Sequence, residues 1–244
     1  MDDVTATHSQ TELEKQGFFQ KWFHLYFSPE KTFRAIDEKP DWILPVSVVA
    51  ILSALILILI FPQMRQLQVE HLMAAKNLSQ AEAEQLLAKG EAFQKIIMPI
   101  STFIMIFVTQ IVASFFFYLV GSVFLGGMVP YTKVLSMWAY TSLAVGIVAM
   151  IVRVPVILAK KTIAVQTSLA AFLSPDSKGT LLYKILSSFD IFILWQLVLM
   201  TVGFTVIYKF SQKKSATVVF GLWALWVVFS ILLRSIFKAP GLGA

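Results

Sequence analysis

Four polar side chains lie within or at the ends of long uncharged segments, where water would be scarce if those segments cross a membrane: Gln110, Arg153, Asp190 and Gln196. An ionisable group inside a membrane commonly marks a functional pathway. Asp190 could serve such a pathway, or it could cap the helix that follows it, because a carboxylate is favoured at the positive end of a helix. Arg153 either extends to the membrane surface or pairs with Asp190. We expect the two glutamines to form hydrogen bonds between helices rather than to bind a substrate.

Residue types that carry other chemistry are missing from these segments. The chain has no cysteine, and its three histidines, His8, His24 and His71, lie outside the uncharged segments at unrelated spacings. Disulfides, thiolate metal ligands and thiol nucleophiles are therefore excluded, and a metal centre or a Ser–His–Asp set is not expected. The sequence also lacks a glycine-rich phosphate loop. It predicts no enzymatic activity, no catalytic residue and no cofactor.

The composition is that of a membrane protein. Hydrophobic residues make up 57% of the 244 residues and charged residues 14%, whereas a soluble domain carries about 25% charged residues. A helix needs roughly 17–25 apolar residues to cross the hydrocarbon layer. Five uncharged segments reach that length, and the second is expected to be one helix that ends at Gly126. The sequence predicts an all-α polytopic protein with five spans, at about 43–62, 98–125, 134–153, 190–209 and 216–236.

The chain divides into an N-terminal tail, residues 1–42, and a membrane domain, residues 43–237. A capping box at Thr11 predicts a helix start in the tail. Six aromatic residues follow at helical spacing, so a helix would carry them on one face, with Lys21 elsewhere. Such a helix either lies in the membrane interface with its rings in the lipid and its lysine in water, or packs its rings on the spans, and both can hold together. The aromatic residues are Phe18, Phe19, Trp22, Phe23, Tyr26 and Phe27.

A second short helix is predicted between Ser28 and Lys39. Ser28 suits the N-cap position, and Pro29 suits the first helical position. The helix should end by Lys39, because a residue before a proline avoids the helical conformation. We expect Asp41 to cap the first span and Trp42 to lie at the level of the lipid headgroups.

A helical connector outside the membrane is expected over 63–95, and an amphipathic connector with a turn at 174–179 is expected over 160–188. The span between them is rich in small and hydroxylated residues. Its Ser142 and Gly146 have the spacing that lets helices approach closely in a membrane. This span is therefore predicted to lie at the centre of the bundle.

Four stretches of the sequence resemble the bacterial branch of the Yip domain family, and the resemblance extends from about residue 18 to residue 237, nearly the whole chain. They are SPEKTFRAIDEKPDWILP (28–45), GGMVPYTKVLSMWAYTSL (126–143), VQTSLAAFLSPDS (165–177) and LSSFDIFILWQLVLMTVGF (186–204). The resemblance implies a five-helix integral protein of the bacterial cytoplasmic membrane, with a cytoplasmic N-terminus and the C-terminus on the opposite side. Eukaryotic members of the family act in vesicle trafficking with Rab GTPases, but the bacterial-type motifs do not carry GTPase binding over to this chain.

Three functions remain open from the sequence. The first is a non-enzymatic adaptor or scaffold for trafficking-like processes or another membrane machine. The second is a small-solute transporter or channel lined by the four polar residues, although five spans do not divide into two equal halves. The third is lipid handling or membrane shaping. Expected partners are membrane lipids and either a second copy or another integral membrane protein. The net charge of +6 is spread over every loop, which suits anionic lipid and does not indicate nucleic acid.

Overall fold

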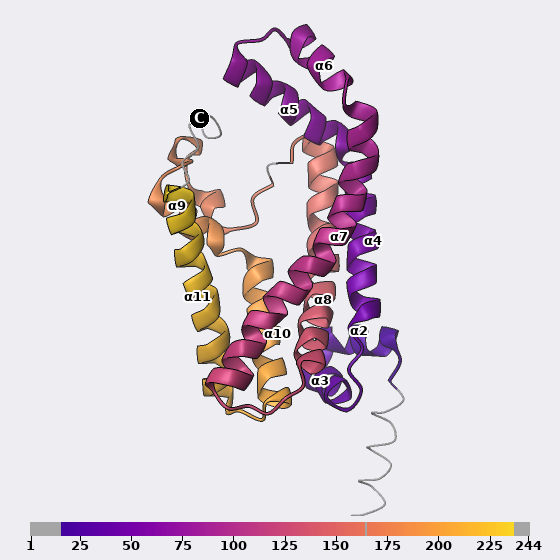
Figure 1. The fold of residues 1–244 in the computed structure, drawn as a ribbon. Coiled ribbons are helices and arrows are strands. Elements are labelled where there is room, and N and C mark those ends of the chain that lie inside the picture. Colours follow the sequence, from indigo (N-terminus) through magenta and orange to yellow (C-terminus); the bar gives the residue numbers. More distant parts are fainter. Residues whose placement is uncertain (1–15, 164, 237–244) are drawn as a thin grey trace, which may run out of the picture.

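The computed structural model describes residues 16–163 and 165–236, and it consists of helices joined by short loops (Figure 1). The predicted all-α fold is confirmed. The helix start predicted at Thr11 lies outside the described residues. Five apolar helices run roughly along one direction: α4 (Ile43–Leu59), α7 (Glu91–Tyr118), α8 (Tyr131–Lys160), α10 (Ile191–Ile207) and α11 (Gln212–Ile236).

Three of these helices, within the part of the chain that the structure describes, are long and apolar enough to cross a membrane on their own. They span 34 residues (Glu91–Phe124), 30 residues (Tyr131–Lys160) and 22 residues (Gln212–Leu233). The fourth candidate is α4, which bends by 61° into α5 (Phe61–Lys76). The fifth, α10, has 17 residues, or about 26 Å at 1.5 Å per residue, which is the lower end of the range for a span. These five helices correspond to the five predicted spans.

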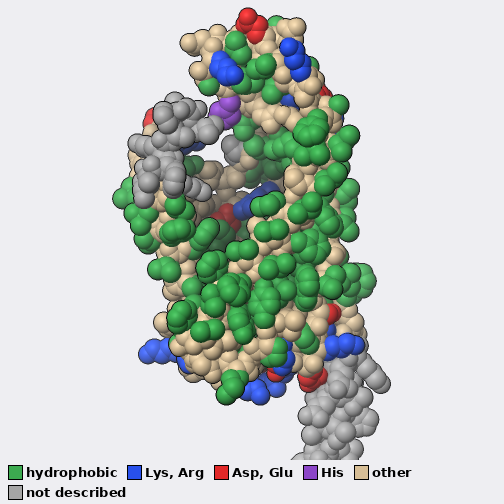
Figure 2. Space-filling model, in the orientation of Figure 1, with side chains coloured by type: hydrophobic (Ala, Val, Ile, Leu, Met, Phe, Trp, Pro, Cys, Tyr) green, Lys and Arg blue, Asp and Glu red, His purple; other side chains and the backbone are tan. Residues whose placement is uncertain are grey.

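The surface has the distribution expected of a protein in lipid. Figure 2 shows hydrophobic side chains covering the middle of the molecule, with charged side chains gathered at its two ends. Exposed large side chains occur along α4, α7, α8, α10 and α11. An apolar belt of this kind is stable only in contact with lipid or with other apolar helices. The chain is therefore a polytopic membrane protein.

Helix α8 forms the centre of the bundle, as predicted. It packs against α4, α7 and α10, and it also contacts α2 (Phe18–Phe27) and α3 (Pro29–Glu38). Met137, Tyr140 and Leu143 on α8 are fully buried. The small and hydroxylated residues of this helix account for its position, because they let neighbouring helices approach on several sides.

The second span is one helix, as predicted. Helix α7 continues into a π-helical turn, η1 (Leu119–Phe124), before the chain reverses at Gly126. The ring of Tyr208 packs against this turn, and a Cβ atom added at Gly121 would lie 2.4 Å from that ring. The same ring excludes a side chain at Gly127. Glycines therefore allow the end of α10 to pack against the turn.

The bend between α4 and α5 follows from Pro62, which occupies one of the first positions of α5 and is favoured at a helix start. Helix α5 leaves the bundle and returns through α6 (Gln80–Ala88) to the start of α7 (Figure 1). Val69 and Ala83 are buried between these helices. Ser79 caps α6 and shares a capping box with Glu82, which holds the pKa of the Glu82 carboxyl below its usual value.

The second connector is helical only in part, and it turns at 174–179 as predicted. It contains two short 3₁₀ turns, η2 (Leu169–Phe172) and η3 (Pro175–Ser177), followed by α9 (Leu181–Ser188). Pro175 begins the second turn, and Gly179 has a positive φ of 95°. Residues with these conformational preferences interrupt a helix. Amphipathic helix is therefore confined to the last part of the connector.

Candidate functional site

Arg153 and Asp190 form an ion pair, with 2.6 Å between Arg153 Nη2 and Asp190 Oδ2. Thr167 joins the pair from the connector. Its hydroxyl accepts hydrogen bonds from the Arg153 guanidinium, at 2.6 Å from Nη2 and 3.2 Å from Nε, and donates to the Asp190 carboxylate. The Asp190 side chain is 10% exposed and that of Arg153 is 37% exposed. The two charges therefore compensate each other at the edge of the bundle.

Asp190 is also the N-cap of α10. Its Oδ1 atom accepts a hydrogen bond from the backbone N–H of Phe192 at 2.9 Å. The capping and pairing alternatives for Asp190 are thus both realised, because the two carboxylate oxygens have different partners. The guanidinium of Arg153 also lies 5.0 Å from the centre of the Phe192 ring.

The backbone brings the connector to this pair. Ser168 and Asp190 form an isolated antiparallel bridge, in which Leu169 N–H donates to Phe189 C=O at 3.1 Å. This contact fixes Thr167 beside Asp190. The connector is thereby attached to the start of α10 at the level of Arg153.

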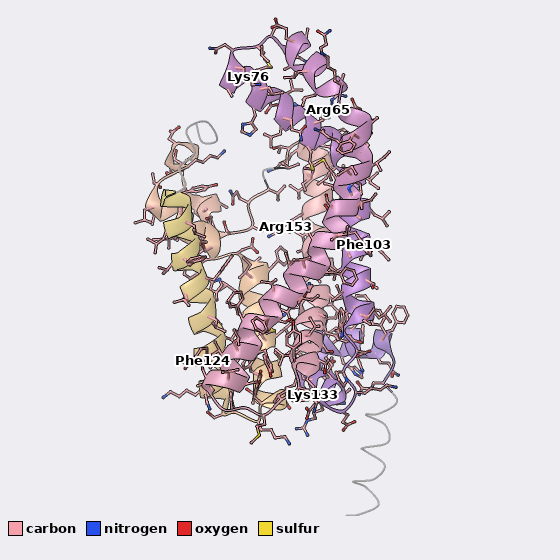
Figure 3. All side chains as sticks on the ribbon, viewed as in Figure 1. Arg65, Lys76, Phe103, Phe124, Lys133 and Arg153 are labelled. Carbon is pink, nitrogen blue, oxygen red and sulfur yellow. The ribbon has the colours of Figure 1, made fainter. Side chains whose placement is uncertain are left out.

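A hollow opens on the side of the molecule at this level. Figure 2 shows it as a recess with both positively and negatively charged side chains on its floor. In the same orientation, Figure 3 places Arg153 pointing from α8 into this recess, toward α10. In this view, the upper part of α11 lies to the left of the recess (Figure 1). The recess therefore separates α11 from α8 in the upper half of the bundle.

The two glutamines differ in their surroundings. Gln196 on α10 donates a hydrogen bond from Nε2 to the Ser142 hydroxyl on α8, at 3.2 Å. Gln110 on α7 is buried, and its Oε1 atom has no hydrogen-bond partner among the described residues. The structure thus joins Gln196 to another helix through Ser142, and it brings neither glutamine to the Arg153–Asp190 pair.

The close approach predicted at Gly146 does not occur within this chain. A Cβ atom added there would meet no atom within 4 Å. Helices α8 and α10 are connected instead by side chains above and below this glycine, at Arg153 and Ser142. Close approach is found at Gly203 on α10, where an added Cβ atom would lie 2.5 Å from the sulfur of Met137.

The aromatic residues of α2 divide into two stripes. Phe18, Trp22 and Tyr26 pack on the core, where the Tyr26 hydroxyl donates to the Ala144 carbonyl at 2.9 Å. The other stripe is exposed at 58–74% and consists of Phe19, Phe23 and Phe27. One stripe thus packs on the protein, which is one of the two arrangements predicted, and the other stripe is exposed.

Lys21 is buried, contrary to the prediction that it faces water. Its ammonium group donates to Asp41 Oδ1 at 2.9 Å and to the Lys39 carbonyl at 3.2 Å. Asp41 does not cap the first span, because its second oxygen accepts a hydrogen bond from the Tyr140 hydroxyl at 2.9 Å. The cap position belongs to Trp42, which is half-buried and makes no side-chain capping bond. The sequence analysis does not predict this network. Its local signals are the acidic residue Asp41 and the apolar residues on either side of Lys21.

The fold confirms several local predictions for α3. Pro29 begins the helix and Glu38 ends it, one residue before the predicted limit at Lys39. Phe33 and Ile36 are fully buried, and α3 packs against α10 and α8. A second ion pair joins Asp37 of α3 to Lys133 at the start of α8. The two N-terminal helices are therefore an integral part of the bundle.

These features define the chain as an all-α polytopic membrane protein with two N-terminal helices packed under the bundle. Residues 23–233 match the Yip1 domain family. The chain belongs to that family, whose members are generally non-enzymatic membrane proteins. The resemblance found in the four sequence stretches is thereby confirmed. No curated protein and no solved structure shows a significant match to the chain.

Proposed function

We propose that this protein is a non-enzymatic membrane adaptor that holds a transmembrane helix of a partner against α11. The observation that carries the proposal is the sparse packing of α11. This helix packs mainly against α10 and more lightly against α9, and almost none of its most apolar stretch is buried. Membrane helices associate through close van der Waals packing, so a helix with so few neighbours in its own chain suits an intermolecular contact.

The C-terminal half of α11 carries an exposed apolar stripe. Val219, Leu222 and Trp223 face the core. The α11 stripe follows these core residues along the helix at spacings of three and four residues and consists of Leu225, Val228, Phe229 and Leu232, all exposed. This periodicity is typical of a helix that presents one face to a partner helix.

The polar residues favour the adaptor over a transporter. Both oxygens of the Asp190 carboxylate are engaged, one by Arg153 and Thr167 and one by the Phe192 N–H. A proton or ion relay needs groups that are free to exchange partners. Gln110 and Gln196 are not continuous with the pair, so the four residues do not form one polar path. We therefore assign the Arg153–Asp190 pair a positioning role.

The partner is another integral membrane protein or a second copy of this chain, with lipid around both and no role for nucleic acid. We place the protein in the bacterial cytoplasmic membrane with a cytoplasmic N-terminus. The five-helix membrane domain, 43–237, would then provide the docking surface, and the tail, 1–42, would lie on the cytoplasmic side. The exposed aromatic stripe of α2 would enter the cytoplasmic leaflet, and Trp42 would lie at its headgroup level.

The proposal is tested by crosslinking in native membranes at native expression level, followed by purification in mild detergent and mass spectrometry. We expect one stoichiometric partner, either a second membrane protein or a second copy. Recovery of the chain as a monomer with no crosslinked species would contradict the adaptor function. Solute uptake by the purified protein alone in liposomes, lost in Asp190→Asn, would favour the transporter instead.

A further inference from the structure

A second recess lies at the end of the molecule that is opposite to α2 and α3. It is an open cleft of about 640 Å³, formed by the end of α4, the bent α5, α6 and the start of α7. This volume is within the range of about 300–1,000 Å³ that is usual for sites of small ligands. Val69 and Ala83 pack α5 and α6 together, so the walls of the cleft are supported.

One end of the cleft is apolar and lies at the membrane. Its lining includes Leu57 and Ile58 from α4, Phe61 at the bend, and Pro99 from α7. Helix α4 carries no charged residue, and α7 carries none after Lys95. These surfaces are therefore continuous with the apolar belt, where acyl chains are the expected neighbours.

The other end of the cleft is charged. Arg65 on α5 and Lys95 on α7 both pair with the carboxylate of Glu91, the latter at 2.7 Å. The side chain of Lys95 remains 56% exposed and that of Arg65 30% exposed. A guanidinium has five N–H donors and an ammonium three, so both cations retain donors that can bind a further anionic group.

The charged groups mark the headgroup level. Lys95 is the last charge before the apolar run of α7, and Arg65 is the first after that of α4. Two cations at this level can bind a phosphate through charge-assisted hydrogen bonds. Glu84 from α6 also lines the cleft, so the lining has two cationic and two anionic side chains. This balance suits a headgroup that carries a phosphate and an amine better than a purely anionic one.

We infer that the cleft between α4, α5 and α7 binds one phospholipid with a zwitterionic headgroup, whose phosphate is held by Arg65 and Lys95 and whose acyl chains lie along Ile58 and Pro99. This site is separate from the α11 stripe. It does not depend on the proposed adaptor function.

The test is native mass spectrometry of the full chain released from nanodiscs that contain equal amounts of phosphatidylethanolamine and phosphatidylglycerol. We expect one retained phosphatidylethanolamine in the unmodified protein. Loss of two charge-assisted hydrogen bonds should lower its retention about tenfold or more in Arg65→Gln/Lys95→Gln. The matched control Lys76→Gln/Lys89→Gln removes two cations of the same connector that do not line the cleft, and its retention should be unchanged.

A further variant separates lipid binding from a structural role of the ion pairs. Glu91→Gln breaks the same two ion pairs, the one between α5 and α7 and the one within α7, but leaves both cations unpaired, so lipid retention should rise and shift toward phosphatidylglycerol. If Glu91→Gln loses lipid as the double variant does, the ion pairs only hold the cleft together and the inference is wrong. Equal retention in all variants would also overturn it. Thermal stabilisation by inorganic phosphate with no retained lipid would assign the site to free phosphate instead.

Discussion

The guanidinium of Arg153, near the end of α8, lies 2.6 Å from the carboxylate of Asp190, the residue that caps α10. The connector between these helices returns to the same point, because Thr167 bonds to both side chains. One ion pair thus links two spans and the segment that joins them. The pair thus fixes the start of α10, the helix against which α11 mainly packs.

Substitution of one member of this pair should destabilise the protein. Asp190→Asn retains an oxygen that can cap α10 but leaves Arg153 without its carboxylate, and we expect the free energy of unfolding to fall by about 2 kcal/mol. This is below the 3–5 kcal/mol typical of a fully buried pair, because Arg153 is partly exposed and solvent screens its charge. Unfolding of the purified protein in mixed micelles measures the change.

The double variant Arg153→Gln/Asp190→Asn is the control for a direct interaction. If the two side chains stabilise the fold through each other, the double variant loses less stability than the sum of the single variants. Strictly additive losses would show that the two residues act independently.

Two glycines should respond in opposite ways to alanine. In Gly121→Ala the new methyl group would collide with the ring of Tyr208, which lies 2.4 Å from the Cβ position. Overpacking of this kind costs about 1–3 kcal/mol, so the unfolding midpoint should fall. Gly146→Ala meets no atom within 4 Å, and its higher helix propensity should stabilise α8 by up to about 1 kcal/mol. Thermal unfolding of both variants in the same detergent tests this difference, and equal effects would contradict the packing described for Tyr208.

The glutamines Gln110 and Gln196 form a second matched pair. Gln110→Leu removes a buried amide oxygen without a partner among the described residues, so stability should be unchanged or higher. Gln196→Leu breaks the hydrogen bond to Ser142, and a loss of about 0.6 kcal/mol is expected for such a bond inside a membrane. Chemical unfolding of the two variants is the measurement. A larger loss for Gln110→Leu than for Gln196→Leu would mean that Gln110 has a role the packing does not explain.

The helices could be predicted from sequence because uncharged runs and capping residues are local signals. The bounds of α3 follow from Pro29 and Pro40, and the central position of α8 follows from its small residues. The first span is predicted to end at about 62 with a helical connector after it, and the break lies two residues earlier, at Ile60, because Pro62 occupies one of the first positions of α5. The span predicted at about 134–153 lies within a longer helix, since α8 runs from Tyr131 to Lys160.

The polar contacts could be predicted only in part. Pairing of Arg153 with Asp190 was one of two alternatives, because helix direction places both at the same end of the bundle. The contact of Asp41 with Tyr140 joins residues 99 positions apart, and no local pattern indicates it. The sequence predicts Asp41 as a helix cap, because this is the commoner role of an aspartate before an apolar run. The cleft at Arg65 is formed by the bend after α4, and no local pattern in the sequence predicts this cleft.

The adaptor function is tested most directly by site-specific photo-crosslinking in native membranes. A photoreactive residue would replace Leu225 or Phe229 of the α11 stripe, with Ile51 and Leu55 of α4 as controls that are also apolar and exposed. A bound partner helix should yield one discrete protein adduct from both α11 positions and only lipid adducts from α4. Lipid adducts alone from all four positions would show that α11 faces the bilayer, and this result would contradict the proposed function.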